Sequence, residues 1–158
     1  MRPKITAPDT NELTSLLKSE IKDALGSMDK FVTVGIHEDK NARKDMFSNA
    51  QVGAANHFGT SRIPARPFLD VGVEMGTNKY LRIIKSAAEN NEPLDLALER
   101  CGIVAAGEVQ KYIRELQDPP NAESTIKKKK SANPLIDTGQ LRQSISYKVT
   151  STKPSEGI

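Results

Sequence analysis

The clearest pattern of apolar and polar positions predicts a long amphipathic helix in the second half of the chain. Apolar residues recur every three or four positions from Leu94 to Leu116, and polar residues fill the positions between them. This spacing places the apolar side chains on one face of a helix. Pro93 is tolerated at a helix start, and Asp118-Pro119-Pro120 ends the pattern. Gly102 and Gly107 lower the helix propensity and are expected to permit close packing.

Weaker periodic patterns predict three further helices. They cover residues 10–25, residues 49–58 and residues 68 to about 90, and the last of these is expected to break at one of two glycines. Small polar residues precede the first two helices and glycines follow them, as is typical of helix ends. The expected caps are Asp9 or Thr10 and Asn49, the expected stops are Gly26 and Gly59, and the expected break is at Gly72 or Gly76.

Two short segments read as strands. Residues 31–36 are rich in β-branched side chains, with Val32, Val34 and Ile36 on one side, and residues 145–150 alternate in the same way. The predicted fold class is therefore α+β: a small, mainly antiparallel sheet packed by about four helices, with long loops. A sheet this small needs helical cover, or strands completed by other subunits, to be stable.

The 158 residues suffice for one domain with a core. Residues 1–8 are expected to form a flexible N-terminal arm, residues 9–150 a single domain, and residues 151–158 a C-terminal tail. Within the domain, residues 37–48 read as a loop. Residues 119–134, rich in Pro, Asn, Ser and Lys, read as a mobile loop or an arm that orders on binding.

Composition narrows the function classes. An apolar fraction of 37% is low and suggests a small core, or one completed by neighbouring subunits. No apolar run reaches the roughly 20 residues that a membrane span needs, and no signal peptide follows Met1, so assembly in a cytoplasm is the default. The net charge of +3 does not by itself require nucleic acid.

Few residues suit metal or thiol chemistry. With two His and one Cys, the chain has too few classical ligands for a metal site. The single cysteine, Cys101, lies on the apolar stripe of the long helix, which favours a buried small side chain over a reactive thiol.

Catalysis is a weak alternative. His37 follows the first strand beside Glu38 and Asp39, but neighbouring residues on a strand point to opposite faces, so these groups are not expected to converge. His57 is the other candidate for a small hydrolase. A solvated strand end is the ordinary interpretation of His37, and the chain is expected not to be an enzyme.

One basic run suggests a second alternative, a nucleic-acid-binding module. The residues Lys127, Lys128, Lys129 and Lys130 could neutralise phosphates and face DNA. No aromatic residues interleave with them, so a stacking groove for single strands is not supported. A solvated loop is the commoner role of such a run.

A stiff segment from Phe58 to Phe68 carries two aromatic side chains, two prolines and two arginines. Aromatic residues and Arg on a rigid loop are typical of interface hot spots, although Phe58 and Phe68 would also serve as core residues. Arg62 and Arg66 are expected to form ion pairs that fix the loop or join subunits. On this view Arg66→Ala reduces assembly more than folding.

Two motifs together resemble a known family. The segments Ile63-Pro64-Ala65-Arg66-Pro67-Phe68-Leu69 and Pro134 to Ile145 (PLIDTGQLRQSI), with Val34 to Asp39 and Phe58-Gly59-Thr60 before them, are similar to the head–tail connector and tail-completion (neck) proteins of long-tailed bacteriophages. Order and spacing match over about residues 31–150. In the later motif, Asp137 is expected to cap the turn through Thr138-Gly139-Gln140.

The resemblance implies a non-enzymatic structural virion protein without a cofactor. It would form a homo-oligomeric ring, commonly of six subunits, at the head–tail junction, assembled in the host bacterial cytoplasm. Its partners would be head-completion or adaptor proteins, tail-tube proteins and DNA passing without sequence specificity. Neck, tail-completion and tail-terminator positions remain open. The expected interface residues are Phe58, Arg62, Pro64, Arg66, Pro67, Phe68, Asp137, Leu141 and Arg142.

Overall fold

The computed structural model describes residues 15, 19, 29–42, 47–129 and 131–152. Apart from Ser15 and Ser19, the expected first helix lies outside the described residues, as do the expected N-terminal arm and residues 153–158 of the tail. The elements in chain order are β1 (Phe31–Ile36), the 3-10 turn η1 (Glu38–Lys40), α2 (Asn49–His57), α3 (Phe68–Met75), α4 (Thr77–Glu89), α5 (Leu94–Glu115), α6 (Glu123–Lys129), α7 (Gln140–Ser144) and β2 (Ile145–Thr150).

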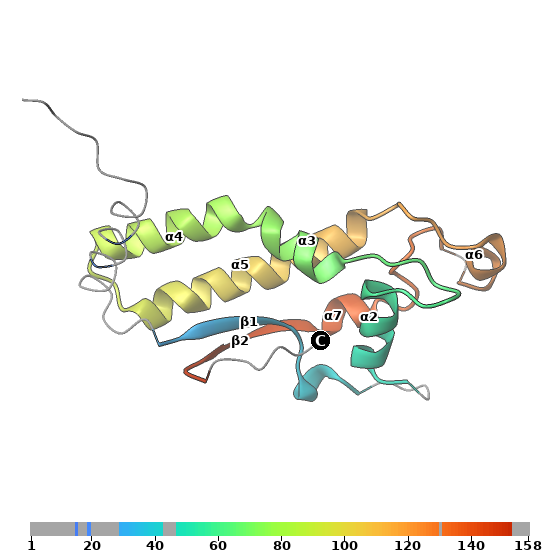
Figure 1. Ribbon diagram of the computed structural model, residues 1–158, viewed down its shortest axis with the longest axis horizontal. Helices are drawn as coiled ribbons and strands as arrows, with labels where there is room; N and C mark the ends of the chain where they lie inside the picture. Colours follow the sequence, from blue (N-terminus) through green and yellow to red (C-terminus); the bar gives the residue numbers. More distant parts are fainter. Residues whose placement is uncertain (1–14, 16–18, 20–28, 43–46, 130, 153–158) are drawn as a thin grey trace, which may run out of the picture.

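The long helix α5 is the centre of the arrangement (Figure 1). The β1–β2 ribbon lies along one side of α5, and α3 and α4 lie along the other. Helices α2 and α7 pack together beyond one end of the ribbon, with α6 further out in the same direction. The α+β class is confirmed, with six helices in the described part of the chain.

The two strands form an antiparallel pair with the bounds that the sequence predicted. Phe31 lies opposite Thr150, and Ile36 lies opposite Ile145. Val34, Ile36 and Tyr147 pack against the buried core. Within the described residues each strand pairs only with the other, so each has one edge without a strand partner.

The core lies between α5 and the elements on both its sides. Close approach requires glycine at two positions. A Cβ atom at Gly72 of α3 would lie 2.6 Å from Cα of Val109, and one at Gly102 of α5 would lie 2.2 Å from the ring of Tyr147. The packing role expected for Gly107 is wrong for the part of the chain that the structure describes, where no atom of another element lies within 4 Å of a Cβ built there. The buried apolar residues of this core are Phe68, Ala106, Val109, Ile113, Leu116, Leu135, Leu141 and Ile145.

The structure confirms one predicted helix boundary, corrects a second and adds a helix that was not expected. The expected break after Phe68 is confirmed at Gly76, where α3 ends and α4 follows. Ser48, not Asn49, caps α2, because its hydroxyl accepts from the backbone of Gln51 while the Gln51 side chain accepts from the backbone of Ser48. The segment 119–134 is not wholly a loop, since residues 123–129 form α6.

The lone cysteine lies where the helical pattern placed it. Cys101 is buried on α5, and burial raises the pKa of its thiol, opposed in part by Arg100. None of the helices that the structure describes is long and apolar enough to span a lipid bilayer.

Candidate functional site

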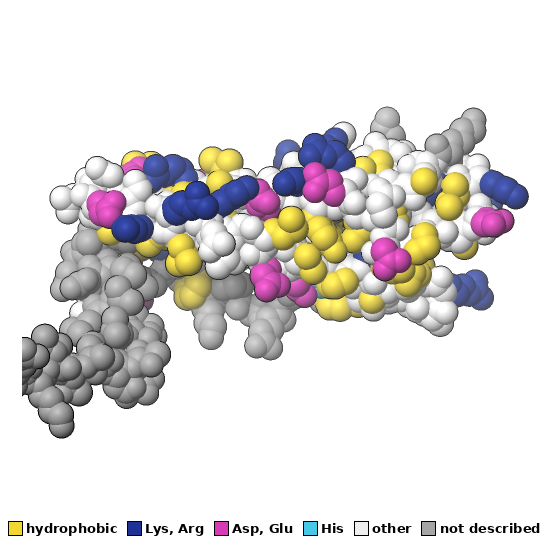
Figure 2. Space-filling view, turned by 90° about the horizontal axis from the view of Figure 1, so that it is seen from above, with side chains coloured by type: hydrophobic (Ala, Val, Ile, Leu, Met, Phe, Trp, Pro, Cys, Tyr) yellow, Lys and Arg dark blue, Asp and Glu magenta, His cyan; other side chains and the backbone are white. Residues whose placement is uncertain are grey.

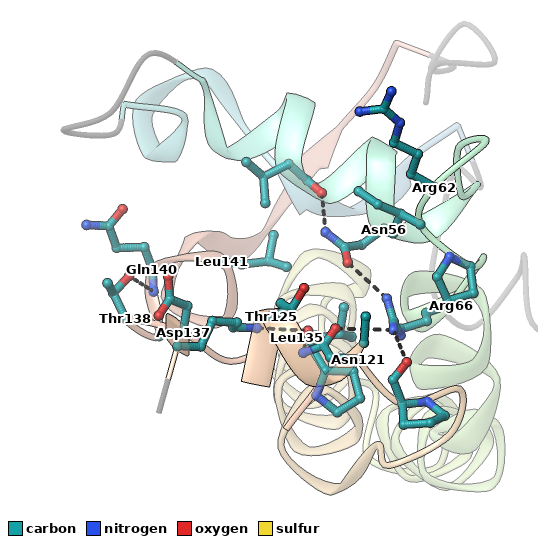
Figure 3. A pocket seen from close by; sticks show the side chains of 18 residues that line it. Asn56, Arg62, Arg66, Asn121, Thr125, Leu135, Asp137, Thr138, Gln140 and Leu141 are labelled. Carbon is teal, nitrogen blue, oxygen red and sulfur yellow. Dashed lines mark hydrogen bonds between the residues drawn. The ribbon is translucent and has the colours of Figure 1, made fainter. Parts of the chain in front are cut away.

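The two segments that carry the family resemblance meet around one cavity (Figure 3). Its volume is about 300 Å³, and its walls come from residues 62–66, 120–129 and 134–141 together with α2. The first and last of these segments are some 70 residues apart in the chain. The fold therefore brings together two motifs that are distant in the chain.

A tight turn begins the first wall. Gly59 follows α2 with a φ angle of +77°, a conformation that side chains other than glycine rarely adopt, and a Cβ there would lie 2.8 Å from the backbone nitrogen of Ala65. The Thr60 backbone N–H donates to the carbonyl of Ile63 at 2.8 Å, and the Thr60 hydroxyl accepts from the N–H of Ile63 at 3.0 Å. These bonds explain the stiffness of the segment.

Arg66 ties this segment to the second wall. Its side chain is only 1% exposed. Nε donates to the carbonyl of Pro119 at 2.9 Å, and one terminal nitrogen donates to the carbonyl of Pro120 at 3.1 Å. Longer bonds reach the side-chain oxygens of Asn56, at 3.3 Å, and Asn121, at 3.4 Å. A single guanidinium thus fixes two loops and α2 against one another (Figure 3).

Arg66 does so without an ion pair. None of the described residues forms a salt bridge with Arg66 or Arg62. The expectation that Arg66 fixes its loop through an ion pair is therefore wrong, because carbonyl and amide oxygens surround the guanidinium instead. Burial lowers the pKa of Arg66, which reflects the cost of holding a charge away from water.

A second cation lies beside the cavity. Lys129 donates from Nζ to the carbonyl of Pro134 at 3.1 Å, and burial lowers its pKa, with Asp137 opposing and Arg66 adding to that effect. Lys129 is therefore half-buried and bonded to its own chain, and the expected role of the lysine run toward DNA stays a prediction. Lys127 and Lys128 are exposed on the last turn of α6, and Lys130 lies outside the described residues.

The structural role of Asn133, which ties the end of α5 to the second motif, was missed by sequence reasoning. Asn133 donates to the carbonyls of Ile113 and Arg114 at the end of α5, at 3.2 and 2.8 Å. Its side-chain oxygen accepts from the backbone of Leu135 and Ile136, each at 2.9 Å. An Asn before Pro134 is a turn signal, and it was the only hint of this role in the sequence.

The expected cap by Asp137 is wrong. The side chain of Asp137 is exposed. The residue that precedes α7 is Gly139, with a φ of +80°, and it has no side chain that could cap the helix. The nearest substitute is the Thr138 hydroxyl, which accepts from the backbone of Gln140 at 3.5 Å. Asp137 instead contributes a negative charge to the rim of the cavity.

The expected interface residues divide into exposed and buried groups. Phe58 is 60% exposed, and Arg62, Pro64, Pro67 and Asp137 are also exposed. The direct surface role expected for three others is wrong, because they are buried within the chain: Arg66, Phe68 and Leu141. Arg142 is intermediate, and its Nε is buried with no hydrogen-bond partner among the described residues.

His37 contacts two hydroxyl groups rather than a carboxylate. Its Nδ1 lies 2.9 Å from Oγ of Ser146, and its Nε2 lies 3.1 Å from Oγ1 of Thr33. Asp39 instead pairs with Lys148 at 3.3 Å. Partial burial and the charge of Lys148 lower the pKa of His37, and Asp39 opposes them.

His57 lies in a different environment. It is 7% exposed and packs edge-on against the rings of Phe58 and Phe68. Its Nε2 lies 3.4 Å from a carboxylate oxygen of Asp70, and its Nδ1 has no hydrogen-bond partner among the described residues. The ring borders an apolar cavity of about 230 Å³ beside Ile36. The two histidines therefore have separate sets of partners.

In the described ranges, no group of three or more His, Cys, Asp or Glu side chains is placed to hold a metal ion. Comparison with known proteins adds no relative: no family model, no curated protein and no solved structure matches the chain.

Proposed function

We propose that the protein is a structural subunit of an oligomeric ring at the head–tail junction of a long-tailed bacteriophage. The observation that carries the proposal is the alternation of exposure along the stiff segment. Arg66 and Phe68 are buried and fixed, whereas Phe58, Arg62 and Pro64 before them and Pro67 between them are exposed. The segment presents an aromatic ring and a guanidinium on a backbone that the fold already holds in place.

Such a surface suits association between proteins. Aromatic and Arg side chains contribute most of the binding energy at protein interfaces. Because the backbone is ordered before binding, little conformational entropy is lost when a partner docks. If each copy docks this segment onto a different surface of the next copy, the contact repeats head to tail. Such a contact produces a closed ring when the rotations between successive copies add up to a full turn.

The sheet supports the same proposal. Each of its two strands has an edge without a strand partner among the described residues. Strands of neighbouring copies can add to such edges through backbone hydrogen bonds. The resemblance of both motifs to neck and tail-completion proteins supplies the location, as a proposal, at the junction of head and tail.

The experiment is to measure the molar mass of the purified full chain by light scattering after size-exclusion chromatography. Negative-stain images are taken of the protein alone and with purified tail tubes. We expect a single closed ring at micromolar concentration. Phe58→Ser removes the exposed ring and should weaken association by about 30-fold or more, since hot-spot residues contribute about 2 kcal/mol or more.

The matched control is Leu81→Ser on α4. Leu81 is 63% exposed, close to the 60% of Phe58, but it lies outside the stiff segment. It should leave the molar mass unchanged. A wild-type chain that stays monomeric alone and with tail tubes would contradict the proposal, as would equal effects of the two substitutions.

A further inference from the structure

We propose that the cavity beside Arg66 binds a carboxylate side chain donated by an adjoining protein chain. It rests on the proposed function in one respect: assembly supplies the neighbouring chain that donates the carboxylate. The affinity of the cavity for a carboxylate is a property of the single chain and is measurable whatever its assembly state.

The charge lining the cavity is unbalanced. Its charged side chains are Arg62, Arg66, Lys129 and Asp137, which leaves a formal excess of two positive charges. Arg66 is almost completely buried, and its hydrogen-bond partners among the described residues are all neutral oxygens. A buried charge without a counter-ion is costly, so an anion entering the cavity would be attracted to it.

Hydrogen-bond donors are also available at the cavity. Arg62, Thr125 and Gln140 also line it, and their side chains form no hydrogen bond within the part of the chain that the structure describes. Arg62 and Gln140 come from the two motifs, and Thr125 comes from α6. The Arg62 guanidinium and the Gln140 amide lie on opposite sides of the cavity in Figure 3, whereas Arg66 and Lys129 are close enough for their charges to interact. Charge-assisted bonds from Arg to a carboxylate are among the strongest in proteins.

The size and walls of the cavity favour a protein side chain over a DNA phosphate. A volume of about 300 Å³ is at the lower end of the range for small-molecule sites, which run from about 300 to 1,000 Å³. Four apolar side chains in the walls would contact the methylene groups of an acidic residue: Val52, Ile63, Leu135 and Leu141. Duplex DNA is instead held by cations on an open surface, and the exposed Lys127 and Lys128 do not line the cavity.

The test is a titration of the full chain followed through the ¹⁵N signals of arginine side chains. Sodium acetate is the probe for a carboxylate, and sodium phosphate and a short DNA duplex are the probes for the nucleic-acid alternative, all at ionic strength fixed with chloride. We expect acetate to shift the Arg66 signals saturably. Lys129→Gln should weaken acetate binding about fivefold to tenfold, because one charge-assisted bond is lost.

The control is Lys128→Gln, which removes the same charge from the exposed side of α6 and should change acetate binding less than twofold. Shifts that acetate and chloride produce equally would overturn the proposal. The proposal would also be overturned if the duplex bound in a way that depends on Lys129 while acetate did not bind.

Light scattering on the same samples separates this proposal from the previous one. If the subunit assembles, the titration is repeated with Phe58→Ser, whose cavity is expected to be free of a neighbour. A chain that stays monomeric but binds acetate would refute the proposed ring and leave the proposed carboxylate site standing. A ring whose dissociated subunits ignore acetate would refute the cavity site alone.

Discussion

Arg66 offers the sharpest test of how this fold is held together. Replacing it with Ala removes two short hydrogen bonds to backbone carbonyls and two longer ones to Asn56 and Asn121. We assign roughly 1.5 kcal/mol to each short bond and about 0.5 kcal/mol to each long one, and about 1 kcal/mol returns because a buried charge is removed. The free energy of unfolding should therefore fall by about 3 kcal/mol.

This expectation reverses the one drawn from the sequence, in which Arg66→Ala affected assembly more than folding. The reason is burial: a side chain that is 1% exposed acts on the fold before it can act on a partner. Arg66→Lys should cost about 1–3 kcal/mol, since an ammonium keeps the charge but cannot reproduce the planar set of donors.

The assay is urea unfolding followed by far-ultraviolet circular dichroism, with Arg62→Ala as the matched control. Arg62 lies on the same segment and carries the same charge, but it is exposed and forms no salt bridge with any described residue. Its removal should change the free energy of unfolding by less than about 0.5 kcal/mol. If Arg66→Ala costs under 1 kcal/mol, or if both variants lose the same amount, then the buried guanidinium does not hold the loops.

Two further predictions follow from α5 and from the sheet. Gly102→Ala should destabilise the chain by about 1–2 kcal/mol, because the new Cβ collides with the ring of Tyr147, whereas Gly107→Ala should stabilise it by up to about 1 kcal/mol. Chemical unfolding of both variants checks this, and a stabilised Gly102→Ala variant would contradict the packing. The pKa of His37 is lowered by partial burial and by Lys148, so the unfolded chain binds a proton more readily than the folded one. The free energy of unfolding should therefore fall as pH drops from about 6.5 toward the lower pKa of His37 in the folded chain, and then level off. His37→Gln should abolish this fall. An identical pH profile in that variant would show that His37 does not cause it.

Local patterns in the sequence predicted the elements well. Both strands have the expected bounds, and α5 runs from Leu94 to Glu115 as the apolar spacing indicated. These predictions succeeded for one reason: the regular spacing of buried positions in a helix or strand requires the same spacing of apolar residues in the sequence. The cap of α2 was misplaced by one residue for a related reason, since Ser48 and Asn49 are both good capping residues and only the reciprocal bond with Gln51 distinguishes them.

The cavity could not be predicted in the same way. Its charged groups come from segments far apart in the chain, and no local pattern records that Arg66 would meet Pro119 and Pro120 rather than a carboxylate. The run of four lysines looked uniform in the sequence. The structure separates them, because the helical turn of α6 directs Lys129 toward Pro134 and leaves Lys127 and Lys128 in solvent.

The pairing of β1 with β2 has a consequence for synthesis on the ribosome. Thr33 and Lys148, which face each other across the ribbon, are 115 positions apart in the chain. The first strand therefore emerges long before its partner has been translated, and throughout that interval its backbone groups lack the hydrogen bonds that they make in the finished protein. A nascent chain that stops before residue 145 cannot form the ribbon by itself.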